Sequence, residues 1–149
     1  MDRMNMAELT KVVLPAPEPN ADSRFYWESA KERRLVVRRC RECGEAHFMP
    51  RSQCPRCWSD QLEWVDCAGT GTVYTFSIVH RAPTPDFAVI GPYVVALIDL
   101  DEGPRMFANV LGRDAMEVRI GDRVHVVFEP RGDAMLIPQF VRSGSGQSR

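Results

Sequence analysis

Four cysteines occur as two short pairs whose spacing suits a metal ion. Residues 40–43 read Cys-Arg-Glu-Cys and residues 54–57 read Cys-Pro-Arg-Cys. Two intervening residues let the backbone curl so that both sulfurs of a pair face one point, and two such pairs supply the tetrahedral thiolates that zinc prefers. We therefore expect one structural zinc ion with the ligands Cys40, Cys43, Cys54 and Cys57. Because four thiolates leave no open coordination position, this zinc is not expected to be catalytic.

A disulfide pair or an iron–sulfur site is the alternative use of these cysteines. The first twenty residues are polar, carry acids and contain three prolines, so we expect no secretory signal. The longest strongly apolar run, Tyr93–Ile98, is too short to span a bilayer. The expected location is the reducing cytoplasm, where paired cysteines bind metal more readily than they form disulfides. Cys67 lies outside the pattern and is expected to be a small buried residue, with a reactive thiol as the alternative.

Catalytic machinery is not evident in the sequence. The three histidines, His47, His80 and His125, stand in no serine–histidine–acid order, and the chain has neither a nucleophile elbow nor a phosphate loop. A lone histidine on a strand is more often structural or solvent-facing than catalytic. We expect a binding module without catalytic residues of its own.

Composition and charge narrow the class of partner. The chain has 149 residues, 44% of them hydrophobic and 26% charged, and a formal net charge of -1. That charge argues against a general nucleic-acid coat, which needs a positive surface to release counterions. Residues 24–56 are nonetheless locally basic, with nine arginines and lysines against four glutamates. This half suits an anion or an acidic surface, although a solvated basic face explains it as well.

The elements that must position these residues can be read from hydrophobic periodicity. A short helix is expected at residues 24–34, with its aromatic first turn in the core; a ligand-facing role for one of these aromatics is the alternative. Short strands are expected at residues 35–37 and 62–65, on either side of the cysteines. Five further strands are expected near residues 72–78, 93–100, 105–111, 124–129 and 135–140. In the first of these, period-2 alternation predicts Tyr74, Phe76 and Ile78 on the core face. So many short strands favour a closed barrel, because closure removes exposed edges.

These expectations divide the chain into four parts. Residues 1–34 form an N-terminal arm and helix, and residues 35–66 form a zinc ribbon. Residues 67–142 form the barrel, and residues 143–149 form a disordered tail rich in serine and glycine.

The order of these motifs resembles the DUF35 family of proteins with a zinc ribbon and an OB-fold. The resemblance covers most of residues 20–140. It departs at Arg33-Arg34, where the family often has glycine before leucine, and at Cys67, where a small polar residue is commoner. The matching segments are Phe25-Tyr26-Trp27, Leu35, Cys40-x-x-Cys43-Gly44, Pro50-Arg51-x-x-Cys54-Pro55-x-Cys57, Gly69-x-Gly71-x-Val73-Tyr74-Thr75-Phe76, Pro92-Tyr93-Val94-Val95-Ala96, Leu100-Asp101-Glu102-Gly103, Asn109 and Ile120-Gly121-Asp122.

The resemblance implies both a fold and a role. The fold is mainly β, with a short N-terminal helix, a rubredoxin-like zinc ribbon and a C-terminal five-stranded OB-fold barrel. The role lies in lipid or steroid metabolism beside a thiolase-like enzyme, in acetoacetyl-CoA synthesis, HMG-CoA synthesis or aldolase cleavage of steroid side-chain CoA thioesters. It implies an accessory subunit that binds a thiolase-like partner and helps to position an acyl-CoA. The expected cofactor is structural Zn²⁺, and the expected ligand is an acyl-CoA thioester.

An acyl-CoA needs cationic partners for its phosphates, and the planar fork of arginine donates two hydrogen bonds at once. Four arginines stand nearest the expected junction of ribbon and barrel, where pockets are common. Exposed arginines without a ligand are the alternative for each. The candidates are Arg38, Arg39, Arg51 and Arg81.

Two other functions compete with this one. OB-folds and zinc ribbons also bind single-stranded nucleic acid, and the basic stretch at residues 31–41 with Tyr74 and Phe76 favours that use. The net charge, the lack of lysine-rich loops and the expected core position of both aromatics oppose it. A free-standing enzyme on CoA thioesters, such as a hydratase, is the third possibility, and no set of residues supports it.

Overall fold

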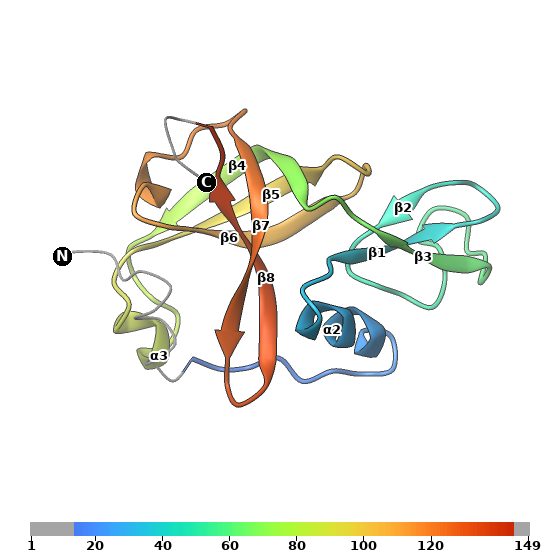
Figure 1. Ribbon diagram of the computed structural model, residues 1–149, viewed down its shortest axis with the longest axis horizontal. Coiled ribbons are helices and arrows are strands. Elements are labelled where there is room, and N and C mark those ends of the chain that lie inside the picture. Colours follow the sequence, from blue (N-terminus) through green and yellow to red (C-terminus); the bar gives the residue numbers. More distant parts are fainter. Residues whose placement is uncertain (1–13, 145–149) are drawn as a thin grey trace.

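A helix, a three-stranded ribbon and a closed five-stranded barrel follow one another along the chain (Figure 1). The computed structural model describes residues 14–144. It confirms the expected mainly β fold with a helix before the ribbon and the barrel. The elements are α2 (Arg24–Lys31), β1 (Val36–Cys40), β2 (Ala46–His47), β3 (Leu62–Asp66), β4 (Thr70–Val79), α3 (Pro85–Ala88), β5 (Tyr93–Leu100), β6 (Arg105–Leu111), a 3-10 turn η1 (Ala115–Glu117), β7 (Arg123–Arg131) and β8 (Met135–Arg142).

The helix α2 buries one face and ends earlier than its predicted end at residue 34. Arg33 adopts a left-handed backbone with φ 61°. Its N–H bonds the carbonyl of Ala30, and the N–H of Arg34 bonds the carbonyl of Ser29, each at 2.9 Å. These are the two hydrogen bonds of a Schellman cap, in which glycine normally takes the left-handed position. Arg33 therefore takes the left-handed position and closes the helix although it is not a glycine.

The ribbon is an antiparallel sheet with β1 between β2 and β3. Arg38 of β1 stands opposite His47 on one side and Trp64 on the other. Strand β2 contains only two residues, because the chain turns away from it into the segment that carries the second pair of cysteines. The sheet is thus a small support from which the cysteine turns project.

The barrel closes in the order β4-β5-β6-β8-β7, with β7 returning to β4. Gly71 of β4 pairs with Leu100 of β5 and with Val124 of β7, so the strand is held from both sides at that point. A Cβ atom there would lie 2.6 Å from the backbone oxygen of Asp99, a distance that only glycine avoids. The absence of a side chain at Gly71 therefore lets β4 pair with β5 and β7 at the same residue.

One face prediction in β4 is wrong. Tyr74 is 48% exposed, whereas Val73 beside it is 1% exposed and faces the core. The pairing of β4 with β5 shifts register between Val73 and Thr75, which marks a β-bulge at Tyr74. The extra residue turns Tyr74 outward, and the alternation then resumes with Phe76 and Ile78 packed against the core as expected.

A single hydrophobic cluster joins helix, ribbon and barrel. Tyr26 of α2, Val36 of β1 and Phe140 of β8 are almost completely buried in it. Because these side chains share one core, the ribbon is packed against the barrel rather than tethered to it. At the opposite end of the barrel, Leu14 of the arm packs with Tyr93 and Leu111 in a second cluster.

The two chain ends limit which expectations can be compared with the structure. Residues 1–13 of the expected arm and residues 145–149 of the expected disordered tail lie outside the described residues. Within residues 14–144 no helix has the length and apolar character needed to cross a bilayer.

Candidate metal centre and ligand cavity

The four paired cysteines lie on two turns of the same design. After β1, the N–H groups of Glu42 and Cys43 both point at the Cys40 sulfur at 3.4 Å, and the N–H of Gly44 bonds the Cys40 carbonyl at 2.9 Å. Gly44 has φ 80°, a conformation that glycine adopts without strain. The short C-x-x-C spacing therefore folds as a tight turn that presents its sulfurs to a common point.

The second turn repeats this pattern. The N–H of Arg56 points at the Cys54 sulfur at 3.4 Å, and the N–H of Trp58 bonds the Cys54 carbonyl at 2.8 Å. Trp58 has φ 69° and a side chain that is 74% exposed. Each turn thus contributes one buried and one exposed cysteine to the site: Cys40 and Cys54 are buried, and Cys43 and Cys57 are exposed.

The four sulfurs gather as a tetrathiolate site requires. All lie within 4.8 Å of one another. The Cys40 and Cys57 sulfurs are 3.5 Å apart, and the Cys43 and Cys54 sulfurs are 3.6 Å apart. A zinc ion with bonds of about 2.3 Å places tetrahedral sulfurs about 3.8 Å apart. A disulfide needs about 2.05 Å, so the distances match a metal centre.

The protein also favours the ionised form of the first ligand. Hydrogen bonds from the N–H of Cys43, and then from that of Glu42, lower the pKa of the Cys40 thiol to about 7. A thiolate is the form that binds metal. The donor set, the spacing and the backbone hydrogen bonds all suit a closed structural zinc site.

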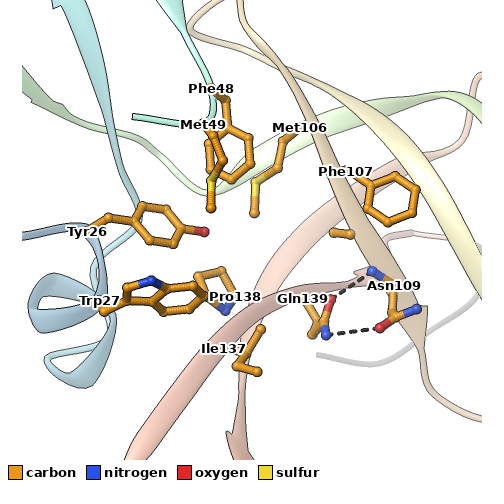
Figure 2. A pocket seen from close by; sticks show the side chains of 11 residues that line it. Tyr26, Trp27, Phe48, Met49, Met106, Phe107, Asn109, Ile137, Pro138 and Gln139 are labelled. Atoms are coloured by element: carbon orange, nitrogen blue, oxygen red, sulfur yellow. Dashed lines mark hydrogen bonds between the residues drawn. The ribbon is translucent and has the colours of Figure 1, made fainter. Parts of the chain in front are cut away.

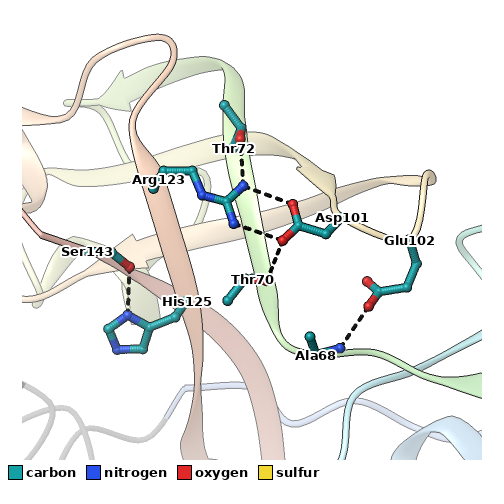
Figure 3. Close-up of polar contacts among 8 residues, drawn as sticks. All are labelled: Ala68, Thr70, Thr72, Asp101, Glu102, Arg123, His125 and Ser143. Atoms are coloured by element: carbon teal, nitrogen blue, oxygen red, sulfur yellow. Dashed lines mark hydrogen bonds and ion pairs between the residues drawn. The ribbon is translucent and has the colours of Figure 1, made fainter.

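The fifth cysteine stands apart from this centre. Cys67 is half-buried, and burial, followed by the neighbouring carboxylate of Glu102, raises the pKa of its thiol to about 12. Glu102 itself accepts a hydrogen bond from the N–H of Ala68 at 2.8 Å, as Figure 3 shows. A thiol with so high a pKa stays protonated at neutral pH, as expected for a packing residue.

A cavity of about 290 Å³ lies where helix, ribbon and barrel meet. Figure 2 shows that α2 supplies Tyr26 and Trp27, the ribbon supplies Phe48 and Met49, and β6 and β8 form the remaining wall. Strands β6 and β8 are paired only at two positions near the end of β6, so they diverge before that point. The cavity is the space between these two diverging strands, α2 and the ribbon.

Two amide side chains bridge the gap at one end of the cavity. The Gln139 Oε1 accepts from the N–H of Asn109 at 2.7 Å, and its Nε2 donates to Asn109 Oδ1 at 3.0 Å. The same Nε2 donates to Glu129 Oε1 at 3.0 Å, and Glu129 also accepts from Arg131 at 3.0 Å. Glu129 is 1% exposed, so its charge is compensated inside the protein by this network.

The structure separates the four candidate arginines. Arg38 lies over the Trp64 ring at 4.6 Å and donates to the Leu62 carbonyl at 3.3 Å. Arg39 stands 3.8 Å from a Glu63 oxygen. Arg51 is exposed in the ribbon segment that follows Met49, while Arg81 is exposed in the connection between β4 and α3. In Figure 1, α3 lies at the end of the barrel away from the ribbon, so Arg81 is not brought together with the other three.

His47, His125 and the turn carboxylate Asp101 have structural partners. His47 is buried, and its Nε2 accepts from the N–H of Arg51 at 3.3 Å. The His125 ring bonds the Ser143 hydroxyl at 2.8 Å, and Asp101 makes two 2.8 Å contacts with Arg123 (Figure 3). Burial, followed by the charges of Arg38 and Arg51, lowers the pKa of His47, which favours its neutral form.

The sequence did not reveal the cavity. Tyr26 and Trp27 are expected mainly as core residues, with a ligand-facing role for one of the helix aromatics as the alternative, and nothing in the sequence marks Met49, Asn109 or Gln139 as lining residues. Their convergence depends on how α2 docks against the gap between two strands that are distant in sequence. The one available signal was the pair of adjacent aromatics in a short helix, which many buried helices share.

Comparisons with known proteins agree with the two-part architecture. Residues 27–63 match the family model described as the rubredoxin-like zinc ribbon domain of ChsH2, and residues 64–129 match the model of its C-terminal OB-fold domain. A solved structure described as the Ltp2-ChsH2(DUF35) aldolase contains a similar chain, with a TM-score of 0.75 and 36% identity. The likeness covers 87% of this chain and 100% of that one.

Three curated relatives extend this picture. A DUF35 domain-containing scaffold protein of Methanocaldococcus jannaschii is 39% identical over 68% of this chain and 73% of its own length. A probable enoyl-CoA hydratase alpha subunit of Thermomonospora curvata is 38% identical over 87% of this chain, which spans only 40% of that relative. The benzoylsuccinyl-CoA thiolase subunit BbsA of Geobacter metallireducens is 35% identical over 50% of this chain and 48% of its own length.

Proposed function

Because this chain belongs to the DUF35 family, we propose that it is a non-catalytic accessory subunit that binds a thiolase-like enzyme and helps to position a CoA thioester. The observation that carries the proposal is the match to the DUF35 chain of an aldolase over that chain's full length. The names of the relatives supply the enzyme classes: one is a thiolase subunit, one is a hydratase alpha subunit and one is a scaffold protein. A CoA thioester is the chemistry that the named enzymes of this group share.

The physical character of the chain supports a holding role. The tetrathiolate centre is closed to substrate, and its rigid turns shape a ribbon that shares a core with the barrel. His47 accepts the N–H of Arg51, and His125 bonds the Ser143 hydroxyl; among residues 14–144 neither ring has an acid hydrogen-bonded to its other nitrogen, so neither completes the nucleophile–base–acid set that group transfer needs. We place this assembly in a reducing cytoplasm, where thiolates stay available for zinc.

The four arginines remain our candidates for the phosphates of CoA, now as two separate groups. Arg38, Arg39 and Arg51 belong to the ribbon, and Arg81 belongs to the far end of the barrel. Of the ribbon group, Arg51 keeps an exposed guanidinium for which the structure shows no acidic partner within residues 14–144. Comparing Arg51→Glu with Arg81→Glu in a CoA-binding assay shows which group faces the phosphates, because charge reversal weakens binding only at the correct site.

The exposed Tyr74 favours binding of a single-stranded nucleic acid, since it stands on the outer wall of an OB barrel. Its ring is covered by the guanidinium of Arg105 at 3.4 Å, and Asp99 holds that arginine at 2.6 Å. A base must displace this stacked pair before it can stack on the tyrosine. We therefore rank this function second.

Co-purification tests the proposal. The tagged chain is expressed with a candidate thiolase-like protein from the same organism, and the eluate is analysed by size-exclusion chromatography with light scattering. We expect one complex that contains both chains and binds CoA. Recovery of this chain alone, with salt-dependent binding of a labelled oligonucleotide that is still measurable at physiological ionic strength, would reject the accessory-subunit proposal in favour of the second function.

A further inference from the structure

The cavity between α2, the ribbon and the barrel has the chemistry of a ligand site, although its size is at the lower end for such sites. Its volume is about 290 Å³, and binding pockets for small molecules begin at about 300 Å³. None of its described lining residues is charged. Two side chains at its edge are exposed, Phe107 by 63% and Met49 by 45%, so the cavity is open on the side where these residues stand.

The polar groups at the inner end of the cavity are already saturated. Gln139 uses its oxygen and its amide nitrogen within the network with Asn109 and Glu129, and the Asn109 amide nitrogen donates to the Val94 carbonyl at 2.9 Å. A ligand with several polar groups would give up its hydrogen bonds with water on entering the cavity and would not replace them there. The lining therefore selects an apolar group.

One hydrogen-bond donor is an exception. The side chain of Tyr26 is buried, and Figure 2 shows its hydroxyl pointing into the space between Met49, Met106 and Pro138. No hydrogen bond of this hydroxyl is present within residues 14–144. Burial raises the pKa of the hydroxyl well above its usual value, so it remains a neutral donor at every physiological pH. An apolar ligand with one acceptor oxygen matches this arrangement.

The walls can adapt to the length of such a ligand. Met49 and Met106 both line the cavity, and methionine side chains change rotamer at low cost to fill irregular space. Ala108 leaves the floor open where a larger residue would occupy it. These features suit a flexible aliphatic chain better than one rigid shape.

We propose that this cavity binds the apolar acyl group of a thioester, with the Tyr26 hydroxyl donating one hydrogen bond to a carbonyl oxygen of that group. The assignment of the group to a thioester rests on the proposed function above. It adds a substrate-contacting surface on the accessory chain, formed by residues of helix, ribbon and barrel together. Selectivity for acyl length then depends partly on this chain and not only on its enzyme partner.

The test uses methyl ketones as CoA-free probes on the full zinc-loaded chain, with ¹³C-methyl labelled methionine. Titration with 2-butanone, 2-hexanone and 2-octanone should shift the Met49 and Met106 signals saturably and leave those of Met116 and Met135 in place. Affinity should rise about four-fold for each added methylene until the cavity is filled. Tyr26→Phe should weaken binding roughly five-fold at every length, while Tyr74→Phe, which alters an exposed tyrosine outside the cavity, should change nothing.

Failure of this inference and failure of the proposed function give different results. Absence of a saturable Met106 shift, or equal affinity for all three ketones, overturns the cavity assignment. Octanoyl-CoA and butyryl-CoA are then compared in the complex with the partner. Equal binding of both, without dependence on Tyr26, rejects the acyl assignment and leaves the accessory role intact. Tyr26-dependent ketone binding without any CoA binding or partner supports the cavity and rejects the accessory role.

Discussion

Trp58 occupies in the second cysteine turn the place that Gly44 occupies in the first. Both residues follow the second cysteine of their pair, both donate their N–H to the carbonyl of the first cysteine, and both have a left-handed backbone, with φ 69° and 80°. A side chain in this conformation costs about 1–2 kcal/mol, a cost that glycine escapes. The ribbon therefore carries local strain in the turn that presents an exposed tryptophan.

Relief of that strain is the first prediction. Trp58→Gly should raise the free energy of unfolding of the zinc-loaded chain by about 0.5–1 kcal/mol, because the gain in the turn exceeds the extra chain entropy of glycine. Trp58→Ala is the matched control: it also removes the exposed ring but keeps the Cβ, so it should give no such gain. Urea denaturation followed by circular dichroism measures both. A less stable glycine variant would show that the indole ring stabilises the turn.

Loss of one zinc ligand should affect the ribbon first. Cys43→Ser is expected to lower zinc content from one ion per chain to almost none and to unfold residues 35–65, because metal binding supplies the folding energy of such a ribbon. The closed barrel should stay folded in this variant. Cys67→Ser is the control and should keep its zinc. Elemental analysis and hydrogen exchange of the two variants report metal and local order. Full zinc in the Cys43 variant would refute the four-cysteine assignment.

Alkylation should distinguish the five thiols. With a pKa of about 12, Cys67 has a very small thiolate fraction at pH 8, and it should react with iodoacetamide about a thousand-fold more slowly than a free cysteine. Mass spectrometry of the zinc-loaded chain should show no rapid modification, and removal of zinc should expose four reactive thiols. Glu102→Gln should accelerate the alkylation of Cys67, because it removes the negative charge near that thiol. Prompt single modification of the intact chain would contradict the assigned environment of Cys67.

The buried ion pair behind the cavity should contribute far more to stability than an exposed one. Arg131→Met leaves the Glu129 carboxylate without its cation in a site where only 1% of that residue is exposed. The expected loss is about 3–5 kcal/mol. Arg105→Met, which breaks the exposed pair with Asp99, should cost less than about 1 kcal/mol. Similar losses in the two variants would show that Glu129 is compensated by other groups.

Local patterns predicted much of this structure. The cysteine spacing determines the two turns, because the backbone hydrogen bonds within each turn involve neighbouring residues only. Strands such as β5 and β6 were predicted at their observed bounds, since their apolar runs are flanked by strong turn signals. The order of helix, ribbon and barrel was confirmed, and so was the resemblance to DUF35 proteins.

Other features depend on tertiary structure that no local pattern encodes. The bulge at Tyr74 arises from the pairing of β4 with β5, so period-2 alternation placed that side chain on the wrong face. The sequence also suggests that Arg81 lies with the ribbon arginines at the junction of ribbon and barrel. In the structure Arg81 follows β4, which carries the chain to the other end of the barrel. The cavity requires the divergence of β6 and β8 and the docking of α2.

Reconstitution of activity tests the central claim most directly, namely that this zinc-clamped chain holds a CoA thioester for another subunit. Turnover of a CoA thioester is measured for the thiolase-like partner alone, for this chain alone and for the two combined. The samples that contain this chain are prepared once with the wild type and once with Cys43→Ser. We predict turnover in the wild-type combination, little with the partner alone or with the Cys43 variant, and none with this chain alone. Equal turnover by the partner with and without this chain, or turnover by this chain by itself, would contradict the account.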